Sequence, residues 1–326
     1  MSKIALLSQE TIDKIAAGEV VERPSSVVKE LVENAIDAGA SAITVEIKEG
    51  GISLIRITDN GCGIPKEEVP LAFLRHSTSK IRSAEDLMCV HSLGFRGEAL
   101  SSIAAVSRVE MITKPADALT GTRYVIEGSK EIADEEIGAP DGTTFLVRDL
   151  FYNTPARRKF LKTAQTEGTY ISDMLEKLAL SHPDISFKYI NNNQTRLHTS
   201  GNGKKRDLIY HIYGREIAAA LLEVNYKGEY FSLSGYIGKP VINRGNRNYE
   251  NYFINGRYIK SSLLSRSIEE AYHNFLMQHQ YPFTVLDFTF PGDPLDVNVH
   301  PTKMELRFGQ TQESYKDLCD VLFGEL

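Results

Sequence analysis

The segment Pro24–Asp37 constrains the fold more than any other part of the chain, because it carries the pattern of a long amphipathic helix. Its apolar residues recur at positions 27, 28, 31, 32, 35 and 36, which places them in one stripe. Pro24 suits the first turn of a helix, and Gly39 suits the position just past its end. The pattern predicts a helix that buries one face.

Strand-like and helix-like segments alternate through the rest of the chain. Period-two apolar patterns predict strands at 42–47, 54–58, 107–113, 121–126, 142–147, near Phe187, and at 230–237, 249–254 and 283–290. Helical patterns predict further helices at 98–106, 166–182, 207–222, 261–276 and 312–323. Both halves mix helices with sheets, so we expect an α+β fold of two α/β sandwich domains rather than a doubly wound fold.

Length and composition indicate two globular domains. The chain has 326 residues, of which 42% are hydrophobic and 25% are charged, as in ordinary globular proteins. The polar stretch 191–204 is the best candidate boundary, so we expect domains at 1–200 and 201–326. The cysteines form no CxxC pair, which argues against a zinc ribbon or a disulfide framework. No apolar run approaches the ~18 residues of a membrane span, so we expect a cytoplasmic protein without a membrane partner.

The polar face of the helix at 24–37 carries groups suited to phosphate chemistry. Glu30, Asn34 and Asp37 fall at i, i+4 and i+7, so they line up along one side. A carboxylate one turn from an amide oxygen can hold a general base beside a magnesium ligand. The same trio also fits a solvated helix face, and the pattern alone leaves both interpretations open.

Two glycine-rich loops add to this signal. Asp59-Asn60-Gly61-Cys62-Gly63 follows a predicted buried strand, where a carboxylate can accept a hydrogen bond from an exocyclic amine and glycines admit a flat ring. Gly94-Phe95-Arg96-Gly97 opens into a predicted helix whose N-terminal amides would bind an anion. Taken singly, each loop equally fits an ordinary turn or a tight strand–helix connection.

The motifs of other enzyme classes are absent from the sequence. No GxxxxGK[ST] occurs, which excludes a P-loop, and no GxGxxG precedes a helix, so neither a Rossmann nor a protein-kinase site is supported. No HExxH or Cys/His spacing indicates zinc, and no GxSxG indicates a hydrolase triad.

The acidic-Asn helix, the DxGxG loop and the GxxG loop, in this order, resemble the GHKL ATPases, the family of gyrase, Hsp90 and histidine kinases. Within that family the chain looks most like the MutL/HexB mismatch repair proteins. The segments that carry this resemblance are Ile15–Pro24, Lys29–Ala40, Gly94–Leu100, Phe151–Leu161, Asn255–Arg257 and Asn298–Lys303. The resemblance spans essentially the whole chain and implies a GHKL (Bergerat) ATPase fold followed by a ribosomal protein S5 domain 2-like fold.

The resemblance implies roles for individual residues and ATP and Mg²⁺ as cofactors. Glu30 would orient water for attack on the γ-phosphate, Asn34 would coordinate Mg²⁺, and Asp59 would bind the adenine amine. Lys303 would reach toward the γ-phosphate as a second catalytic residue. The other nucleotide-binding residues would be Ala38, Gly63, Lys80, Gly94, Phe95, Arg96, Gly97 and Thr143.

Local charge points to a DNA partner although the net charge of −6 creates no global positive field. Basic residues outnumber acids within 148–162 and within 244–266, and such clusters can bind phosphates independently of sequence. Any single one of them also fits solvated surface. The residues assigned to DNA are Arg157, Arg158, Lys159, Arg257, Lys260 and Arg266.

The resemblance implies a weak Mg²⁺-dependent ATPase that acts as a matchmaker in DNA mismatch repair. ATP would drive homodimerisation, with residues 1–17 crossing to the partner as an arm, and the dimer would couple MutS to a downstream nuclease or helicase. The chain would be the N-terminal part of a longer protein. Two alternatives are a nucleotide-gated binding module, in which hydrolysis only resets the clamp, and the ATPase part of a type II topoisomerase.

Overall fold

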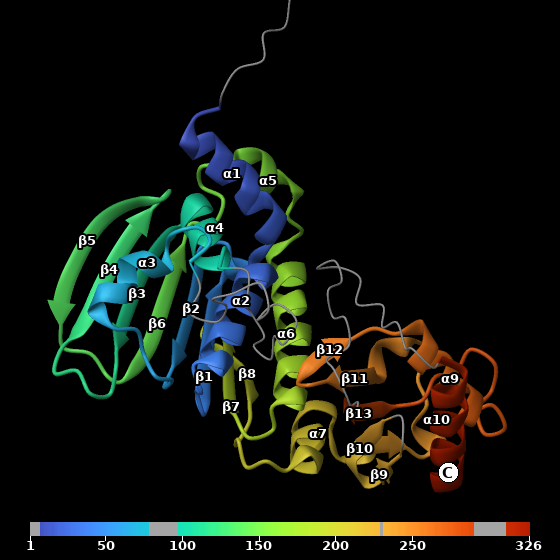
Figure 1. Ribbon diagram of the computed structural model, residues 1–326. Helices are drawn as coiled ribbons and strands as arrows, with labels where there is room; N and C mark the ends of the chain where they lie inside the picture. The colour runs from blue at the N-terminus through green and yellow to red at the C-terminus, as the bar shows by residue number, and fades with distance from the viewer. Residues whose placement is uncertain (1–6, 78–96, 229–230, 290–310) are drawn as a thin grey trace, which may run out of the picture. The chain divides into compact units, whose positions relative to one another are not determined.

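The computed structural model describes residues 7–77, 97–228, 231–289 and 311–326, and the chain divides into two compact units (Figure 1). The first unit contains most of the chain up to Asn202 and is built on an eight-stranded sheet. The second contains Gly203–Leu326, together with Lys177–Pro183, and is built on a five-stranded sheet. Both sheets are mixed and both carry helices, which confirms the predicted α+β class.

The sheet of the first unit has the order β5-β4-β3-β6-β2-β1-β7-β8. All neighbours pair antiparallel except β1 and β7, which run parallel. Its strands are β1 Ala42–Lys48, β2 Leu54–Asp59, β3 Arg108–Lys114, β4 Gly121–Glu127, β5 Lys130–Ile137, β6 Gly142–Arg148, β7 Ser186–Asn191 and β8 Gln194–His198.

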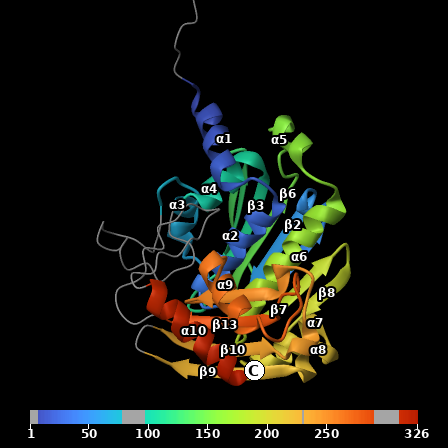
Figure 2. The same ribbon diagram turned by 90° about the vertical axis from the view of Figure 1, so that its right-hand side faces the viewer.

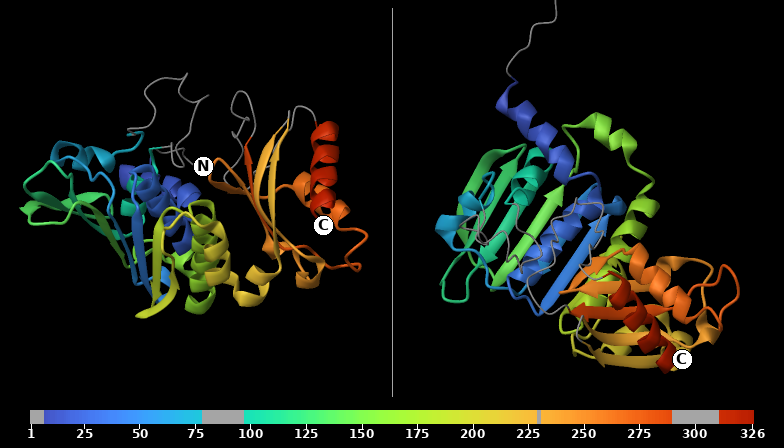
Figure 3. Two further views of the ribbon diagram at one scale, coloured as in Figure 1. Left: turned by 90° about the horizontal axis from the view of Figure 1, so that it is seen from below. Right: turned by 45° about the vertical axis from the view of Figure 1, so that its right-hand side comes forward.

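Helices cover one face of this sheet, and the other face is polar. Along β1, Ile43, Val45 and Ile47 are buried, whereas Thr44 and Glu46 between them are partly exposed, the alternation of a half-buried sheet. Figure 3 shows α2 and α6 on the same side of the strands. Helix α2 packs on β1 and β2, α4 packs on β3 and β4, and α1 packs on α4. The helices are α1 Gln9–Val20, α2 Pro24–Asp37, α3 Val69–Ala72, α4 Ala99–Val106, α5 Pro155–Phe160 and α6 Ala164–Ser181.

The second unit has the strand order β12-β11-β13-β10-β9, in which only β11 and β13 pair in parallel. Its strands are β9 Leu221–Lys227, β10 Ser232–Gly238, β11 Glu250–Ile254, β12 Arg257–Ile259 and β13 Thr284–Thr289. Its helices are α7 Lys205–Tyr213, α8 Arg215–Ala219, α9 Ser262–Ala271 and α10 Thr311–Glu325. Short 3₁₀ turns complete the two units, namely η1 Glu49–Gly51, η2 Lys66–Glu68, η4 Pro240–Ile242 and η5 Arg247–Tyr249.

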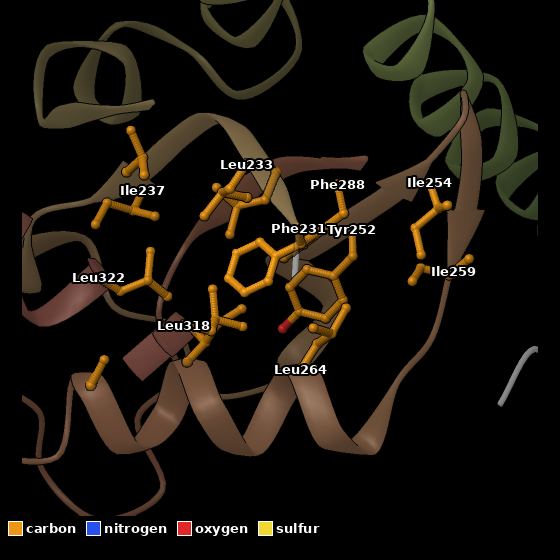
Figure 4. Packing of buried hydrophobic residues seen from close by; sticks show 14 of the residues in the cluster. Phe231, Leu233, Ile237, Tyr252, Ile254, Ile259, Leu264, Phe288, Leu318 and Leu322 are labelled. Atoms are coloured by element: carbon orange, nitrogen blue, oxygen red, sulfur yellow. The ribbon is translucent and has the colours of Figure 1, made fainter. Parts of the chain in front are cut away.

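The core of the second unit lies between its sheet and the helices α9 and α10, which pack against one another (Figures 2 and 4). Leu264 of α9 and Leu318 of α10 meet Tyr252, Leu286 and Phe288 of the central strands. The apolar side chains of β11 and β13 stand at paired positions, Tyr252 beside Leu286 and Ile254 beside Phe288, because the two strands are parallel and in register.

Several predicted elements differ from the structure. The helix expected at 207–222 is wrong: Gly214, with φ of 89°, ends α7, and a separate short α8 precedes β9. The helix expected at 261–276 ends at Ala271. The stretch 191–204, expected to be a linker, includes the edge strand β8, which pairs with β7. Helix α1 and strands β5 and β12 were not predicted from the sequence.

In the described ranges 7–77, 97–228, 231–289 and 311–326, no helix combines the length and apolar character required to cross a membrane.

Truncation of Leu286 to alanine tests the core of the second unit. Leu286 of β13 is fully buried in the core that packs against α9, so Leu286→Ala is expected to lower the free energy of unfolding by about 2–5 kcal/mol. Met277→Ala is the matched control, because Met277 is 84% exposed in the same unit, and its effect should stay within about 0.5 kcal/mol. The chain has no tryptophan, so urea unfolding is followed by circular dichroism. Equal effects of the two substitutions would contradict this core.

Candidate nucleotide site

Helix α2 holds Glu30 and Asn34 at the margin of its buried face. Leu31 and Ala35, the neighbours that follow them in sequence, are buried, and the Glu30 side chain keeps 28% of its surface exposed. Pro24 occupies the first turn, as the sequence predicts, and Ala38 caps the other end. The helix therefore fixes the Glu30 carboxylate where it remains accessible from outside.

The two glutamates of this turn have different environments. Lys29 Nζ lies 3.0 Å from Glu33 Oε2 and 3.8 Å from the Glu30 carboxylate, and the Glu33 side chain is only 9% exposed. Glu33 thus belongs to a helix-stabilising i, i+4 ion pair. Glu30 is the carboxylate that remains suited to act on a solvent molecule or a ligand.

A row of polar residues crosses three neighbouring strands at the edge of the helix-covered face. The register pairs Asp59 of β2 with Thr143 of β6, and Thr143 with Thr113 of β3. All three are buried, and the hydroxyls of Thr113 and Thr143 are 3.0 Å apart. Asp59 follows Ile55 and Ile57 at a spacing of two residues, so the three side chains share one face of the sheet and the Asp59 carboxylate lies on the core side. The apolar core therefore gives way to hydrogen-bonding groups at this end of the sheet.

Burial raises the pKa of the Asp59 carboxyl above its ordinary value of 3.8, because desolvation disfavours the charged form. Hydrogen bonds from the backbone N–H groups of Gly61 and Thr143 oppose this shift. The Gly61 N–H donates to Oδ1 at 2.8 Å. A buried carboxylate at the end of a strand, with one oxygen held by the backbone, is a well-oriented acceptor for an N–H group of a ligand.

The glycine loop after β2 is tied to the end of α2. A Cβ at Gly61 would lie 2.9 Å from the Ala38 Cβ and 3.0 Å from Asp59 Oδ1, so only glycine lets the loop approach both. The Cys62 N–H donates to the Ala38 carbonyl at 3.0 Å. Gly63 has φ of 70°, a conformation that favours glycine. These contacts bring Ala38, Asp59 and Gly63, three residues expected to bind nucleotide, to one end of α2.

Two residues outside the expected set hold this loop in place. The Thr113 hydroxyl accepts from the Ile64 N–H at 2.9 Å. The Asn60 side-chain oxygen accepts from the N–H groups of Ser41 and Ala42, both at 2.9 Å. The place of Thr113 at the site could not be predicted from the sequence, because it follows from the register of β3 on β6, which no local pattern reveals. For Asn60, the Asp-Asn-Gly turn in the sequence was a signal that its side chain could hydrogen-bond to the backbone.

Gly97 is the last residue of the second glycine loop and stands just before α4. It has φ of 59°, and a Cβ there would lie 2.7 Å from the Ser77 carbonyl oxygen. Next to this approach, His76 Nδ1 lies 3.3 Å from Glu98 Oε1. The other residues assigned to the phosphates, Lys80, Gly94, Phe95, Arg96 and Lys303, lie outside the described residues.

A metal ion would have few protein ligands here. Among the described residues, no group of three or more histidine, cysteine, aspartate or glutamate side chains could hold one. Mg²⁺ that is bound to a nucleotide commonly keeps waters and phosphate oxygens and takes only one or two ligands from the protein. Asn34 is the residue of α2 that fits such a role.

The residues assigned to DNA occur in both units. In the first unit, Arg158 and Lys159 are exposed on α5, whereas the guanidinium of Arg157 donates to the Lys14 carbonyl of α1 at 2.9 Å. In the second unit, Lys260 and Arg266 are exposed and Arg257 is partly buried. Another cation of this unit, Arg247, is paired with Glu269 through contacts of 2.5 and 2.9 Å.

Two family models match the chain. Residues 19–148 match the histidine kinase-, DNA gyrase B-, and HSP90-like ATPase family, and residues 209–326 match the C-terminal domain of DNA mismatch repair protein. The chain is 77% identical to DNA mismatch repair protein MutL of Agathobacter rectalis over all 326 residues, and 48% identical to that of Desulforamulus reducens. It covers 50% and 51% of these two proteins, so it spans about half their length.

Solved structures show the same relationship. The N-terminal domain of a DNA repair protein matches with a TM-score of 0.80 and 26% identity over 96% of this chain and 97% of that one. The Aquifex aeolicus MutL ATPase domain complexed with ADP matches with a TM-score of 0.65 and 27% identity, over 83% of this chain and 93% of that one. The topoisomerase IV ATP binding domain of Francisella tularensis, at 15% identity and a TM-score of 0.56, covers 97% of this chain and 90% of that one and shares the fold alone.

These matches confirm a GHKL ATPase domain followed by the S5 domain 2-like domain of MutL proteins. The chain therefore belongs to the MutL family of DNA mismatch repair proteins and corresponds to their N-terminal ATPase region.

Proposed function

We propose that this chain binds ATP with Mg²⁺ at the end of α2 and hydrolyses it slowly, and that the nucleotide drives dimerisation of the region. The observation that carries this proposal is the buried Asp59 carboxylate beside the glycine loop that approaches Ala38. The ADP complex of the Aquifex aeolicus relative, which matches at 27% identity, supports a nucleotide as the ligand.

In this proposal, Asp59 accepts a hydrogen bond from the exocyclic amine of adenine. Thr143 lies beside it in register, and Gly63 leaves room for the ring to approach the backbone. The backbone N–H groups of Gly61 and Thr143 hold the carboxylate, so it keeps one orientation toward the base. This arrangement favours adenine over a base that presents an acceptor at the same position.

Hydrolysis depends on α2. Glu30 holds and orients a water for attack on the γ-phosphate and accepts its proton, and Asn34 provides an oxygen ligand to Mg²⁺. When bound, Mg²⁺ neutralises charge on the phosphates. Gly97, just before α4, contributes its backbone N–H, and Lys80, Gly94, Phe95, Arg96 and Lys303 complete the phosphate contacts in the proposal.

The wider function is that of a mismatch repair matchmaker. The ATP-bound dimer, with residues 1–17 as its arm, binds DNA without sequence preference and couples MutS to a downstream nuclease or helicase. The family match supports this role over the topoisomerase alternative, since topoisomerase IV shares the fold alone. A nucleotide-gated module that uses hydrolysis only to reset shares the same site and differs in the consequence of losing Glu30.

Removal of the Glu30 carboxylate tests the proposed general base. Glu30→Ala should lower ATP turnover by about 10²–10⁴-fold, because the attacking water loses its proton acceptor, while ATP affinity and nucleotide-induced dimerisation remain. Glu33→Gln is the matched control, one turn along the same helix, because Glu33 is engaged by Lys29. Turnover is measured by phosphate release and affinity by calorimetry. Loss of ATP binding in Glu30→Ala, or equal loss of turnover in the control, would refute this assignment.

Substitution of Asp59 tests recognition of the adenine base. In Asp59→Asn the Gly61 N–H keeps the remaining oxygen, so an NH₂ donor faces the adenine amine, and ATP affinity should fall at least about tenfold. Affinity for GTP should fall less, because its O6 is an acceptor. Burial raises the pKa of Asp59, so ATP binding by the native chain should weaken on acidification at a higher pH than an exposed aspartate would give. Asp117→Asn, an exposed loop residue, is the calorimetric control, and an unchanged ATP affinity in Asp59→Asn would contradict the site.

Substitution of the exposed cations of α5 tests DNA binding. Removal of two exposed cations in Arg158→Ala/Lys159→Ala should weaken binding of duplexes of any sequence and reduce the slope of log K against log salt by about 2. Arg108→Ala serves as the control, because Arg108 is already paired with Asp149 at 2.8 Å. Fluorescence anisotropy over a salt series measures both. A slope that stays unchanged in the double variant would remove α5 from the DNA-binding surface.

A further inference from the structure

Two of the segments that carry the family resemblance, Ile15–Pro24 and Phe151–Leu161, contact each other through one side chain. Arg157 of α5 extends to α1 (Figure 1 labels the two helices), and its Nη2 donates to the Lys14 carbonyl at 2.9 Å and to the Ile15 carbonyl at 3.4 Å. Its guanidinium lies directly over Gly18. The mismatch repair role proposed above gives this contact no function.

The nearest neighbour of Gly18 is the end of the Arg157 side chain, which a side chain at position 18 would displace. The residue lies inside α1 and has no positive φ, so the helix could accommodate an L-residue there. Any Cβ at this position would overlap the Arg157 guanidinium. Glycine within a helix is about 1 kcal/mol less favourable than alanine. The chain therefore tolerates a poor helix former at the place where the guanidinium needs the space.

The contact recognises the helix backbone and not a charge. No carboxylate of the described residues forms an ion pair with Arg157, and its Nη1 is buried without a hydrogen-bond partner. Desolvation lowers the pKa of the guanidinium, which is the electrostatic consequence of this burial. Such a group is not arranged to bind a phosphate at the surface, in contrast to Arg158 and Lys159 beside it.

Helix α5 has little other anchorage along its length. None of its residues is buried, and Phe160 is 84% exposed. On the other side of the contact, Ala17 of α1 is fully buried, and the Val21 N–H donates to the Ala17 carbonyl just before α2 begins. Arg157 therefore holds α1, which contains residues 9–17 of the proposed arm and leads into the helix that carries Glu30.

We propose that Arg157 is a positioning residue that holds α1 through the side-chain space left open at Gly18, and so fixes the part of the N-terminal arm from which the residues before α1 extend toward a second copy of the chain. The inference rests on the proposed nucleotide-driven dimerisation. It assigns Arg157 to the arm and leaves DNA contact to the exposed residues of α5.

A double-mutant cycle separates this contact from ordinary helix propensity. Arg157→Ala and Gly18→Ala are each expected to lower the hydrogen-exchange protection of the α1 amides at least about fivefold. With Arg157 removed, the space at position 18 is free, so Gly18→Ala in the Arg157→Ala background should raise protection about fivefold, the gain expected of alanine over glycine. If Gly18→Ala raises protection in the native background as well, the contact does not constrain α1 and the proposal is overturned.

A second measurement tests positioning as opposed to general stability. With a non-hydrolysable ATP analogue, Arg157→Ala and Gly18→Ala should weaken dimerisation at least about tenfold in analytical ultracentrifugation, while calorimetry shows an unchanged affinity of the monomer for ADP. Arg158→Ala is the matched control and should lower DNA affinity without changing dimerisation. Native dimerisation by Arg157→Ala, or a DNA defect in it equal to that of Arg158→Ala, would overturn the assignment. If the native chain itself does not dimerise, the proposed function fails, whereas the exchange cycle still reports on the Arg157–Gly18 contact.

Discussion

The in-register pairing of β2, β6 and β3 is the constraint on which the candidate site depends. It places Asp59, Thr143 and Thr113 in one row at the end of the helix-covered face, where each would otherwise be a buried polar group without a partner. The Thr113 and Thr143 hydroxyls hydrogen-bond to each other, and the loop after β2 donates to both Thr113 and Asp59. A shift of one residue in the register would turn these side chains to the opposite face of the sheet.

Helix α2 could be predicted from the sequence with its bounds, because the apolar stripe, Pro24 and Gly39 all indicate the same segment. The helix expected at 207–222 was wrong because the apolar run after Gly214 continues the helical pattern, although the helix breaks at Gly214 and the run divides between α8 and the start of β9. Strand β5 escaped prediction because it is an exposed, acidic edge strand without apolar alternation. The roles of individual site residues could be proposed only from the resemblance to the GHKL ATPases. The place of Thr113 beside Thr143 became evident only from the register of β3 on β6.

Two glycines of this chain mark close contacts of the backbone with other residues. Gly61 allows the loop to reach Ala38 and Asp59, and Gly18 allows Arg157 to reach the backbone of α1. Arg157 also shows why a basic cluster in sequence is a weak guide to a binding surface, because one of its members is used to hold two helices together. The composition of a basic cluster does not reveal which of its cations form contacts within the fold and which remain exposed for DNA.

The central claim is that Asp59 and the end of α2 form the nucleotide site. A crystal structure of this chain with Mg²⁺ and a non-hydrolysable ATP analogue tests it most directly. The account predicts the adenine amine within hydrogen-bond distance of the Asp59 carboxylate, the metal on Asn34, and a water between Glu30 and the γ-phosphate. A base bound away from Asp59, or phosphates distant from α2, would contradict it.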